Sequence, residues 1–478
     1  MTNTPHRLLA APLSRDGEPL VEQIVRALSA RIDERVLRPG ARLPSIRQFA
    51  AAHGISTFTT VASYDRLVAH GYLESRRGAG FFVRARPGTA QGPAPSADGG
   101  VLRPPLDVSW LVRNMFSQSH HTKPGTGLLP QDWLDAPLLS HALRAVSRQH
   151  GSVLLSYGVP QGFLPLRQQL QLKLEELEIA ANPSQLVTTV GVTQALDLVA
   201  REFTRPGDTV LVDDPGWFMA FAAFASMGLN VVGVPRLADG PDIGQLEQLA
   251  TRHKPRLYIV NSVLHNPTST SMSAAKAFQL LRIAGEHGIT VVEDDVYCDL
   301  LAPGQQVTRL AALDQLQRVI YLGGFSKTLS ANLRVGFIAA SEEHARRLAE
   351  RKLLATLTTS EVGERVIYKI LSEGLYRKHA DRLRTRLDAV RTRTVRMAER
   401  CGLLPEGAPS AGMFLWVDAG RDTGELALSA HAQGILMAPG ALFSPARQPS
   451  TRMRLNVAAL DRAAWDFLER AQETRPGS

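Results

Sequence analysis

The chain has 478 residues, of which 44% are hydrophobic and 21% are charged. This length corresponds to roughly two to four folding units, and the composition is typical of a globular protein. The only two cysteines, Cys298 and Cys401, exclude a disulfide-stabilised scaffold and favour a reducing compartment. We find no signal peptide and no stretch approaching the roughly 18 apolar residues of a membrane helix, so we expect a cytoplasmic protein with no membrane partner.

The net charge of +9 is unevenly distributed along the chain. Residues 1–84 contain 12 arginines and no lysine against 7 acidic residues, a net charge of +5, so the rest of the chain carries only +4. A small basic unit attached to a large, nearly neutral one indicates an anionic partner for the small unit. A basic surface that is merely solvated is the alternative, and charge alone does not decide between the two.

The start of the chain is patterned as three helices and a hairpin. Apolar residues at helical spacing predict helices over residues 19–35, 46–53 and 57–70, with Ser45 as the N-cap of the second. The third helix is expected to bury Val61, Tyr64, Leu67 and Val68. Two strand-like runs follow, separated by a basic tight turn: Tyr72-Leu73-Glu74, Phe81-Phe82-Val83 and, between them, Arg76-Arg77-Gly78-Ala79-Gly80. This order predicts an α+β winged helix-turn-helix domain over residues 1–84.

The composition changes twice after this unit. Residues 85–105 are rich in Pro, Gly, Ala and Ser, which is typical of a linker. From residue 106 to 478, strand-like runs alternate with helical stretches such as 272–287, which predicts an α/β domain with a largely parallel sheet. The expected strands of this sheet include residues 209–212, 257–260, 290–292 and 319–322.

The segment from Pro19 to Val83 resembles the GntR family of bacterial regulators. The residues that carry the resemblance are Leu43-Pro44-Ser45-Ile46-Arg47, Gly54-Ile55-Ser56, Tyr64-Asp65-Arg66-Leu67, Gly71-Tyr72-Leu73 and Arg77-Gly78-Ala79-Gly80. The resemblance implies binding to double-stranded promoter or operator DNA, with the start of the third helix in the major groove and the wing on the backbone or minor groove. The candidate DNA contacts are Arg47, Ser56, Thr57, Thr59, Thr60, Arg76 and Arg77.

Two residues at the start of the third helix depart from this family. Many relatives carry Arg where this chain has Thr57, and Asn where it has Phe58. The DNA sequence that relatives bind therefore cannot be transferred to this chain. For each single arginine in the candidate set, a solvated surface charge is the alternative interpretation.

The segment from Tyr157 to Asn456 carries motifs that resemble fold-type-I aminotransferases. Gly323-Gly324-Phe325-Ser326-Lys327-Thr328-Leu329 and Leu333-Arg334-Val335-Gly336 are similar to the family's Schiff-base lysine segment. The resemblance implies that Lys327 forms an aldimine with the cofactor pyridoxal 5'-phosphate and that Arg334 pairs with the cofactor phosphate. Lys327 follows an expected strand, so its amine can lie at the carboxyl end of the sheet, where α/β proteins bind ligands.

Further residues match the family's cofactor contacts. Asp294, in Asp294-Asp295-Val296-Tyr297, matches the partner of the pyridinium nitrogen. Tyr297 and Asn266 match two donors to the phenolic oxygen of the ring, and Trp217 matches the aromatic residue that stacks on it. The backbone N–H groups of Val192 and Thr193, which open a helix, are expected to meet the phosphate.

Two more residues extend the expected site beyond a single cofactor. Tyr157 matches a tyrosine that reaches the phosphate across a dimer interface, and Arg454, in Met453-Arg454-Leu455-Asn456, matches the arginine that binds the substrate carboxylate. Each of these residues, taken singly, has a simpler explanation. Lys327 could be a surface lysine and Asp294 a helix cap, while Trp217 could pack in the core and Arg454 could form a structural ion pair. Two departures stand beside the matches: Gly324 replaces a frequent Ser or Thr of the family, and Ser269 replaces a Gly.

The combination of both resemblances is similar to the MocR group of regulators. It implies a homodimer that binds DNA and senses pyridoxal phosphate, a small amino compound, or both, by aldimine exchange at Lys327. No metal site is expected. A metabolic aminotransferase with an accessory DNA-binding unit remains the alternative, because every residue needed for transamination is present. A DNA-binding protein with an inactive cofactor fold is disfavoured, because Lys327 and Asp294 are both retained.

Overall fold

The computed structural model describes residues 8–9, 13–14, 17–84, 106–117, 119–148, 155–301, 304–407 and 411–473. The chain divides into two compact units, residues 1–102 and 103–478, which are called the head and the body below. The expected linker, residues 85–105, lies outside the described residues.

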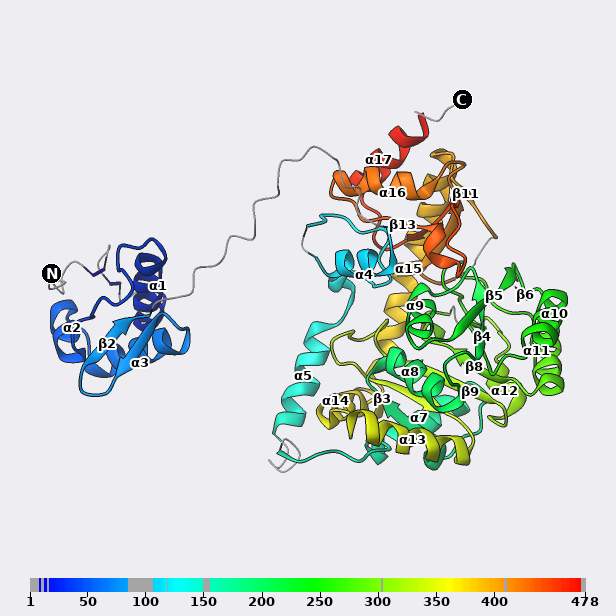
Figure 1. The fold of residues 1–478 in the computed structure, drawn as a ribbon, viewed down its shortest axis with the longest axis horizontal. Helices are drawn as coiled ribbons and strands as arrows, with labels where there is room; N and C mark the ends of the chain where they lie inside the picture. Colours follow the sequence, from blue (N-terminus) through cyan, green and yellow to red (C-terminus); the bar gives the residue numbers. More distant parts are fainter. Residues whose placement is uncertain are drawn as a thin grey trace. The chain divides into compact units, whose positions relative to one another are not determined.

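The head contains three helices at the expected places, α1 (Leu20–Asp33), α2 (Ile46–His53) and α3 (Thr57–Ala69) (Figure 1). Ser45 caps α2 as expected, in a capping box with Gln48: each side chain accepts a hydrogen bond from the backbone N–H of the other residue. Ser56 caps α3 by accepting a hydrogen bond of 2.9 Å from the N–H of Thr59. These caps fix where the second and third helices begin.

The buried face of α3 is turned by part of a helical turn from the expected one. Tyr64 and Leu67 are buried as expected, but Val61 is only half-buried, and Thr60 and Ser63 are fully buried instead. Residues at three- and four-residue spacing share a helical face, so burial of Thr60 and Ser63 moves Val61 toward the side of the helix. The expectation that Val61 belongs to the core of the head was therefore wrong.

The wing of the head is a hairpin of β1 (Leu73–Arg76) and β2 (Gly80–Val83). Residues 40–43 run along the other side of β2, where the N–H of Leu43 donates to the carbonyl of Phe81 at 2.9 Å. The ring of Tyr64 packs against those of Phe49 and Phe81, at centroid distances of 5.5 and 5.0 Å. These contacts join α2, α3 and the wing in one small apolar core.

The body is built on an eight-stranded sheet with the order β3-β10-β9-β8-β7-β4-β5-β6. The five strands β4, β5, β7, β8 and β9 are mutually parallel, and β10 is antiparallel to both of its neighbours. The expectation of a largely parallel sheet is confirmed. The strands are β3 (Leu186–Thr189), β4 (Thr209–Asp214), β5 (Asn230–Leu237), β6 (Gly240–Pro241), β7 (Leu257–Val260), β8 (Thr290–Asp294), β9 (Val319–Gly324) and β10 (Gly336–Ala339).

Helices cover both faces of this sheet (Figure 1). Successive strand residues enter opposite cores: Leu211 of β4 packs on one side, and Val210 and Val212 pack on the other. The first core is shared with α5 (Ala136–Ser147), α7 (Leu164–Glu175), α10 (Ile243–His253), α11 (Ala274–His287), α12 (Leu310–Asp314) and α14 (Glu361–Ser372). The second is shared with α4 (Val108–Phe116), α8 (Gly191–Phe203), α9 (Phe218–Ser226) and α13 (Glu342–Thr356).

A smaller antiparallel sheet, with the order β11-β12-β14-β13, forms the C-terminal part of the body. Its strands are β11 (Leu404–Pro405), β12 (Phe414–Asp418), β13 (Ala438–Pro439) and β14 (Arg452–Asn456), and its helices are α15 (Leu375–Arg400), α16 (Thr423–Ala432) and α17 (Arg462–Glu473). Short 3-10 helices are η2 (Gln131–Trp133), η3 (Pro183–Gln185), η4 (Cys298–Leu300) and η5 (Gly440–Phe443). Within the described ranges, no helix is both long and apolar enough to cross a membrane.

Candidate functional site

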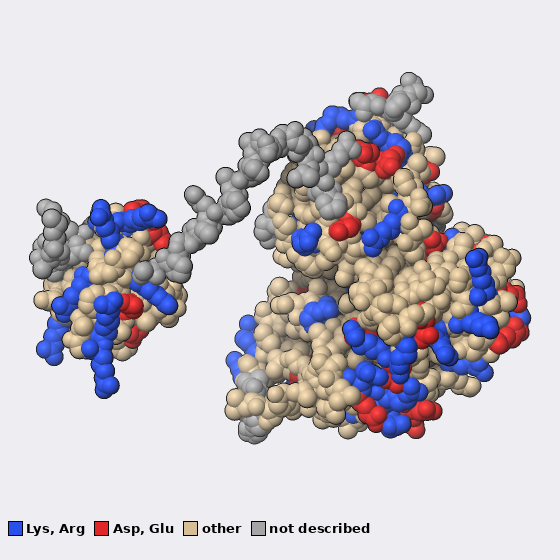
Figure 2. All heavy atoms as spheres, viewed as in Figure 1, with Lys and Arg blue, Asp and Glu red and all other residues tan. Residues whose placement is uncertain are grey.

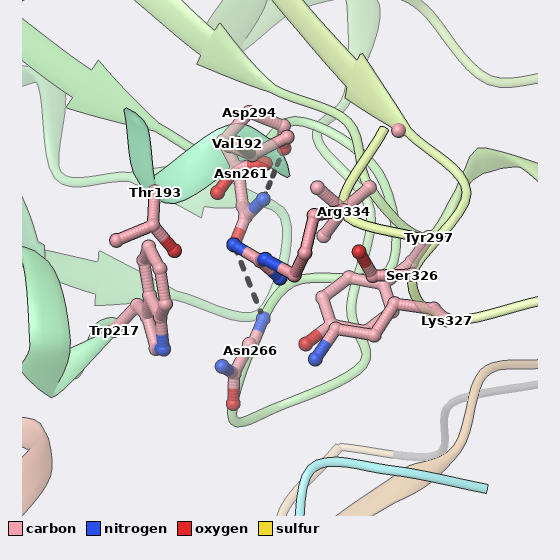
Figure 3. A pocket seen from close by; sticks show the side chains of 12 residues that line it. Val192, Thr193, Trp217, Asn261, Asn266, Asp294, Tyr297, Ser326, Lys327 and Arg334 are labelled. Carbon is pink, nitrogen blue, oxygen red and sulfur yellow. Dashed lines mark hydrogen bonds between the residues drawn. The ribbon is translucent and has the colours of Figure 1, made fainter. Parts of the chain in front are cut away.

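A pocket opens in the body where the parallel strands β7, β8 and β9 end. These strands are neighbours in the sheet, so residues that follow them along the chain meet at one edge. Figure 3 shows Thr193 and Trp217 on one side of the pocket and Tyr297 and Lys327 on the other. The lining residues are Val192, Thr193, Trp217, Asn261, Asn266, Asp294, Val296, Tyr297, Gly324, Ser326, Lys327 and Arg334.

Lys327 lies three residues beyond the end of β9, and its amine is held inside the pocket. Its Nζ donates a hydrogen bond of 2.9 Å to the carbonyl of Gly127 and lies 5.8 Å from the ring centre of Tyr297. Burial lowers the pKa of Lys327 to about 8, and the nearby cations Arg454 and Arg334 act in the same direction, against Asp294. About a tenth of this amine is therefore unprotonated at pH 7, far more than for a lysine with the ordinary pKa, and the unprotonated amine is the form that acts as a nucleophile.

Asp294 is the last residue of β8 and is 7% exposed. Burial raises the pKa of Asp294 to about 7, assisted by the neighbouring Asp295 carboxylate and opposed by Lys327. Its Oδ1 is buried and has no hydrogen-bond partner among the described residues. A buried carboxylate oxygen without a donor is costly, so this atom is poised to accept a hydrogen bond from a ligand.

The N-terminus of α8 and Arg334 form the cationic end of the pocket. Gly191, the first residue of α8, has φ of +71°, and a Cβ there would lie 2.7 Å from Nη2 of Arg334. Only glycine leaves this helix start open beside the guanidinium, which donates 2.9 Å to the carbonyl of Val190. The N–H groups of the first helical turn and a guanidinium favour an anion at this end.

Arg454 of β14 is not part of the pocket lining but hydrogen-bonds to one lining residue, Asn266. It is 2% exposed, and its Nη1 donates to Oδ1 of Asn266 at 2.8 Å while its Nη2 donates to the carbonyl of Gly125 at 2.7 Å. Its guanidinium also lies 4.4 Å from the ring centre of Phe414. Burial lowers the pKa of Arg454 to about 10, which leaves it charged at neutral pH. A charge held this rigidly next to Lys327 can orient a carboxylate.

The structure brings together eight of the expected cofactor residues in the pocket lining: Val192, Thr193, Trp217, Asn266, Asp294, Tyr297, Lys327 and Arg334. It does not bring in Tyr157, whose side chain is 81% exposed and outside the lining. The role of that residue in a dimer stays a prediction.

Sequence reasoning missed Asn261, Ser326 and the backbone of Gly127. Asn261 directly follows β7, and its amide donates to the carbonyl of Asp294 (Figure 3). The strand-end argument used for Lys327 would have found Asn261 as well, because Asn261 is a polar residue directly after an expected strand. Gly127 approaches so closely that a Cβ there would lie 3.7 Å from the amine of Lys327. That proximity joins residues 200 positions apart, which no local pattern reports.

The departure at Ser269 keeps the backbone conformation that favours glycine. Ser269 has φ of +56° and is 3% exposed, and its hydroxyl accepts a hydrogen bond of 3.2 Å from the N–H of Phe414. This bond offsets part of the strain of a left-handed serine. The bond also connects the loop after β7 to Phe414, the first residue of β12, and Arg454 lies over the ring of this same phenylalanine.

The head presents most of the expected DNA-contacting residues on its surface. Arg47, Ser56, Thr57, Arg76 and Arg77 are exposed, and Thr59 is half-buried. Figure 2 shows basic side chains projecting from the head, the smaller unit at the left; all are arginines, since residues 1–84 contain no lysine. The expectation for Thr60 is corrected: its side chain is 0% exposed, and its hydroxyl bonds to the carbonyl of Ser56 at 3.3 Å.

Comparison with known proteins matches both units. Residues 124–468 match the aminotransferase class I and II family, and residues 20–83 match the gntR family of bacterial regulatory proteins. The uncharacterized HTH-type transcriptional regulator YdcR of Escherichia coli is 28% identical, over 95% of this chain and 96% of its own. The probable rhizopine catabolism regulatory protein MocR of Rhizobium meliloti is 30% identical, over 78% and 76%.

A solved aminotransferase structure has a similar fold. The multiple substrate aminotransferase of Thermococcus profundus superposes with a TM-score of 0.70 at 27% identity, covering 77% of this chain and 94% of its own. This match covers 77% of the chain, whereas the similarity to YdcR covers 95% of it. This chain therefore belongs to the aminotransferase class I and II family, in the MocR-like form that carries an N-terminal GntR-family helix-turn-helix region.

Proposed function

We propose that this chain is a DNA-binding transcription regulator whose body binds pyridoxal 5'-phosphate and responds to a small amino compound. The observation that carries the proposal is the pairing of Lys327 and Asp294 in one pocket of a chain that also has a GntR-family head. A lysine with lowered pKa facing a carboxylate with raised pKa is typical of a site that performs chemistry on a ligand.

The residues of the pocket fit pyridoxal phosphate at both ends of that molecule. The buried Oδ1 of Asp294, without a partner among the described residues, suits the protonated nitrogen of a pyridine ring. The open start of α8 at Gly191, beside Arg334, suits a phosphate. The amine of Lys327 belongs to a residue that lines the same pocket as Asp294, Arg334 and the first turn of α8, which supports its role as the residue that holds the cofactor.

When bound, pyridoxal phosphate supplies an aldehyde that condenses with primary amines and a ring that withdraws electrons. Lys327 would hold it through the unprotonated amine, and Asp294 would keep the proton on the ring nitrogen. Tyr297 and Asn266 would donate to the ring oxygen, and Trp217 would cover one face of the ring. Arg454 would bind the carboxylate of an amino acid and so orient its amine toward Lys327.

A second copy of the chain is part of this proposal. Exposed apolar side chains occur in residues 155–159 and again around the end of α13: Leu155, Tyr157, Val159, Leu353, Leu354 and Leu357. Val159 and Leu353 line the same surface hollow, so these two segments are neighbours. An apolar patch of this kind supports a homodimer, in which Tyr157 would reach the other subunit. The molar mass measured by light scattering tests this. We expect the wild type to be a dimer and Leu354→Asp to dissociate more readily into monomers.

A metabolic aminotransferase with an accessory DNA-binding head is the second candidate. The likeness of the body to a multiple substrate aminotransferase and the presence of Lys327, Asp294 and Arg454 in one region favour it. Steady-state assays with common amino donors and keto acids separate the two. We expect slow turnover with every pair, whereas fast and selective transamination would favour the enzyme.

Borohydride reduction of the pyridoxal phosphate complex, followed by peptide mapping, tests the assignment of the pocket. Lys352 is a matched control, because its pKa is also lowered to about 8 by burial. Its amine, however, donates to the hydroxyls of Thr188 and Thr359 at 3.3 and 3.1 Å, outside the pocket lining. We expect the label on the peptide that contains Lys327. A label on Lys352, or absence of a visible absorption band, would contradict the proposed pocket.

A further inference from the structure

The start of α3 carries a large apolar side chain that the head does not cover. Phe58 is the second residue of α3 and is 82% exposed. The inner face of α3 is marked by the buried residues Thr60, Ser63, Tyr64 and Leu67. Residues two positions apart on an α-helix are turned by about 200°, so Phe58 points almost directly away from that inner face.

The neighbours of Phe58 make the outer face of the first two turns mostly apolar. Val61 and Ala62 are half-buried beside it, and the first charged residue on this face, Asp65, comes two turns after Phe58. The small side chain of Ala62 leaves room for another surface to approach the helix closely. This face is therefore suited to apolar contact more than to reading hydrogen-bonding groups.

Most hydroxyls at the helix start are already engaged within the helix. The Ser56 hydroxyl accepts from the N–H of Thr59 and lies 2.8 Å from the Thr59 hydroxyl. The hydroxyls of Thr60 and Ser63 donate to the carbonyls of Ser56 and Thr59, at 3.3 and 2.8 Å. Fewer polar groups than the sequence suggests are thus available to read base edges, which leaves Phe58 as the most prominent side chain there.

We propose that Phe58 is a specificity-determining residue that reads the C5 methyl group of thymine in the major groove. This inference rests on the proposed DNA-binding function of the head. The start of the second helix of a helix-turn-helix faces the base edges, and thymine is the only base of unmodified DNA that presents a methyl group there. Arg76 and Arg77 are exposed on the same small unit and would hold the phosphates, while Phe58 contributes to sequence preference.

The test begins with duplexes that the full-length protein selects from a random pool. Each thymine of the selected consensus is then replaced by deoxyuridine, which removes the methyl group and leaves every hydrogen-bonding atom in place. We expect a position in the half-site where this change weakens wild-type binding about fourfold, the effect of one buried methyl group. Other thymines of the same duplex serve as internal controls.

Variants assign the effect to the side chain. Phe58→Ala is expected to bind the thymine and deoxyuridine duplexes equally, and Phe58→Leu, which keeps an apolar side chain, is expected to retain part of the discrimination. Phe278→Ala is the matched control, because Phe278 is a 69% exposed phenylalanine of the body, on α11. It should discriminate as the wild type does. Circular dichroism checks that each variant is folded.

Two results overturn the inference while the DNA-binding function stands. The first is sequence-specific wild-type binding that is indifferent to deoxyuridine at every thymine. The second is full methyl discrimination by Phe58→Ala, which would assign the effect to another residue. If the protein selects no sequence at all and its binding does not weaken with salt, the DNA-binding function itself fails, and this inference fails with it.

Discussion

Replacing Asp294 with Asn is expected to stabilise the cofactor-free body, and to do so more at pH 8 than at pH 5. The pKa of Asp294 is about 7 in the folded body, against 3.8 for a free carboxyl. Between these values the folded state binds more protons than the unfolded state, so stability falls as pH rises through this window. The penalty is fully present above about pH 7 and is relieved as pH falls toward 4.

The size of the effect follows from the two pKa values. Keeping Asp294 in the folded body costs about 4 kcal/mol at pH 8 but only about 2 kcal/mol at pH 5. Asparagine is uncharged at both pH values, and its own unsatisfied amide costs the same at both. The difference between the two pH values, about 2–3 kcal/mol, therefore isolates the ionisation of Asp294 from the other consequences of the substitution.

Urea unfolding followed by tryptophan fluorescence measures this difference. All five tryptophans lie at position 110 or later, so the signal reports the body and not the head. Asp132→Asn is a suitable control, because the Asp132 side chain is 74% exposed. Equal stabilisation by Asp294→Asn at pH 5 and pH 8 would refute the raised pKa. The same substitution should weaken retention of pyridoxal phosphate, because the ring nitrogen loses its counter-charge.

Three further substitutions test other parts of the site. Arg454→Ala should abolish the response to amino acids while leaving cofactor absorbance nearly intact; an unchanged response in a titration of DNA binding would remove Arg454 from effector recognition. Arg47→Ala should weaken specific DNA binding by about 1–3 kcal/mol if Arg47 contacts a base, or lower the salt dependence of binding if Arg47 contacts a phosphate. Fluorescence anisotropy at several salt concentrations distinguishes the two contacts. An unchanged affinity with an unchanged salt dependence would exclude both contacts. Gly324→Ser should tighten cofactor binding in an equilibrium titration. A Cβ at this position would lie 3.4 Å from its nearest atoms, an ordinary van der Waals contact, and the serine hydroxyl can donate to a phosphate. Weaker binding would contradict this geometry.

The sheet and the strand-end residues were predictable because their signals are local. Runs such as 290–292 and 319–322 are β-branched and apolar, and they became β8 and β9. Parallel strands bring their carboxyl ends to one edge, so Asp294 and Lys327 could be expected to meet. Recognition of the aminotransferase motifs supplied the roles that spacing alone does not give.

The features that could not be predicted depend on helical phase or on distant contacts. A rotation of part of a turn decides whether Thr60 or Val61 enters the core of the head, and both residue types tolerate either place. The contact of Gly127 with Lys327 and that of Arg454 with Asn266 join segments about 200 residues apart. Such contacts follow from the packing of the small sheet and the 125–127 segment on the large sheet, which leaves no periodic trace in the sequence.

The central claim is that a ligand in the body pocket controls DNA binding by the head. The direct measurement is the DNA affinity of full-length wild type and Lys327→Ala, each with and without pyridoxal phosphate and a panel of amino acids. A ligand shifts DNA binding only through its differential affinity for two conformations, and such coupling is typically about 5–150-fold. We predict a shift in this range for the wild type, and for Lys327→Ala a folded protein that binds DNA with no shift. A wild-type affinity that is indifferent to cofactor and amine, together with rapid transamination, would contradict the account.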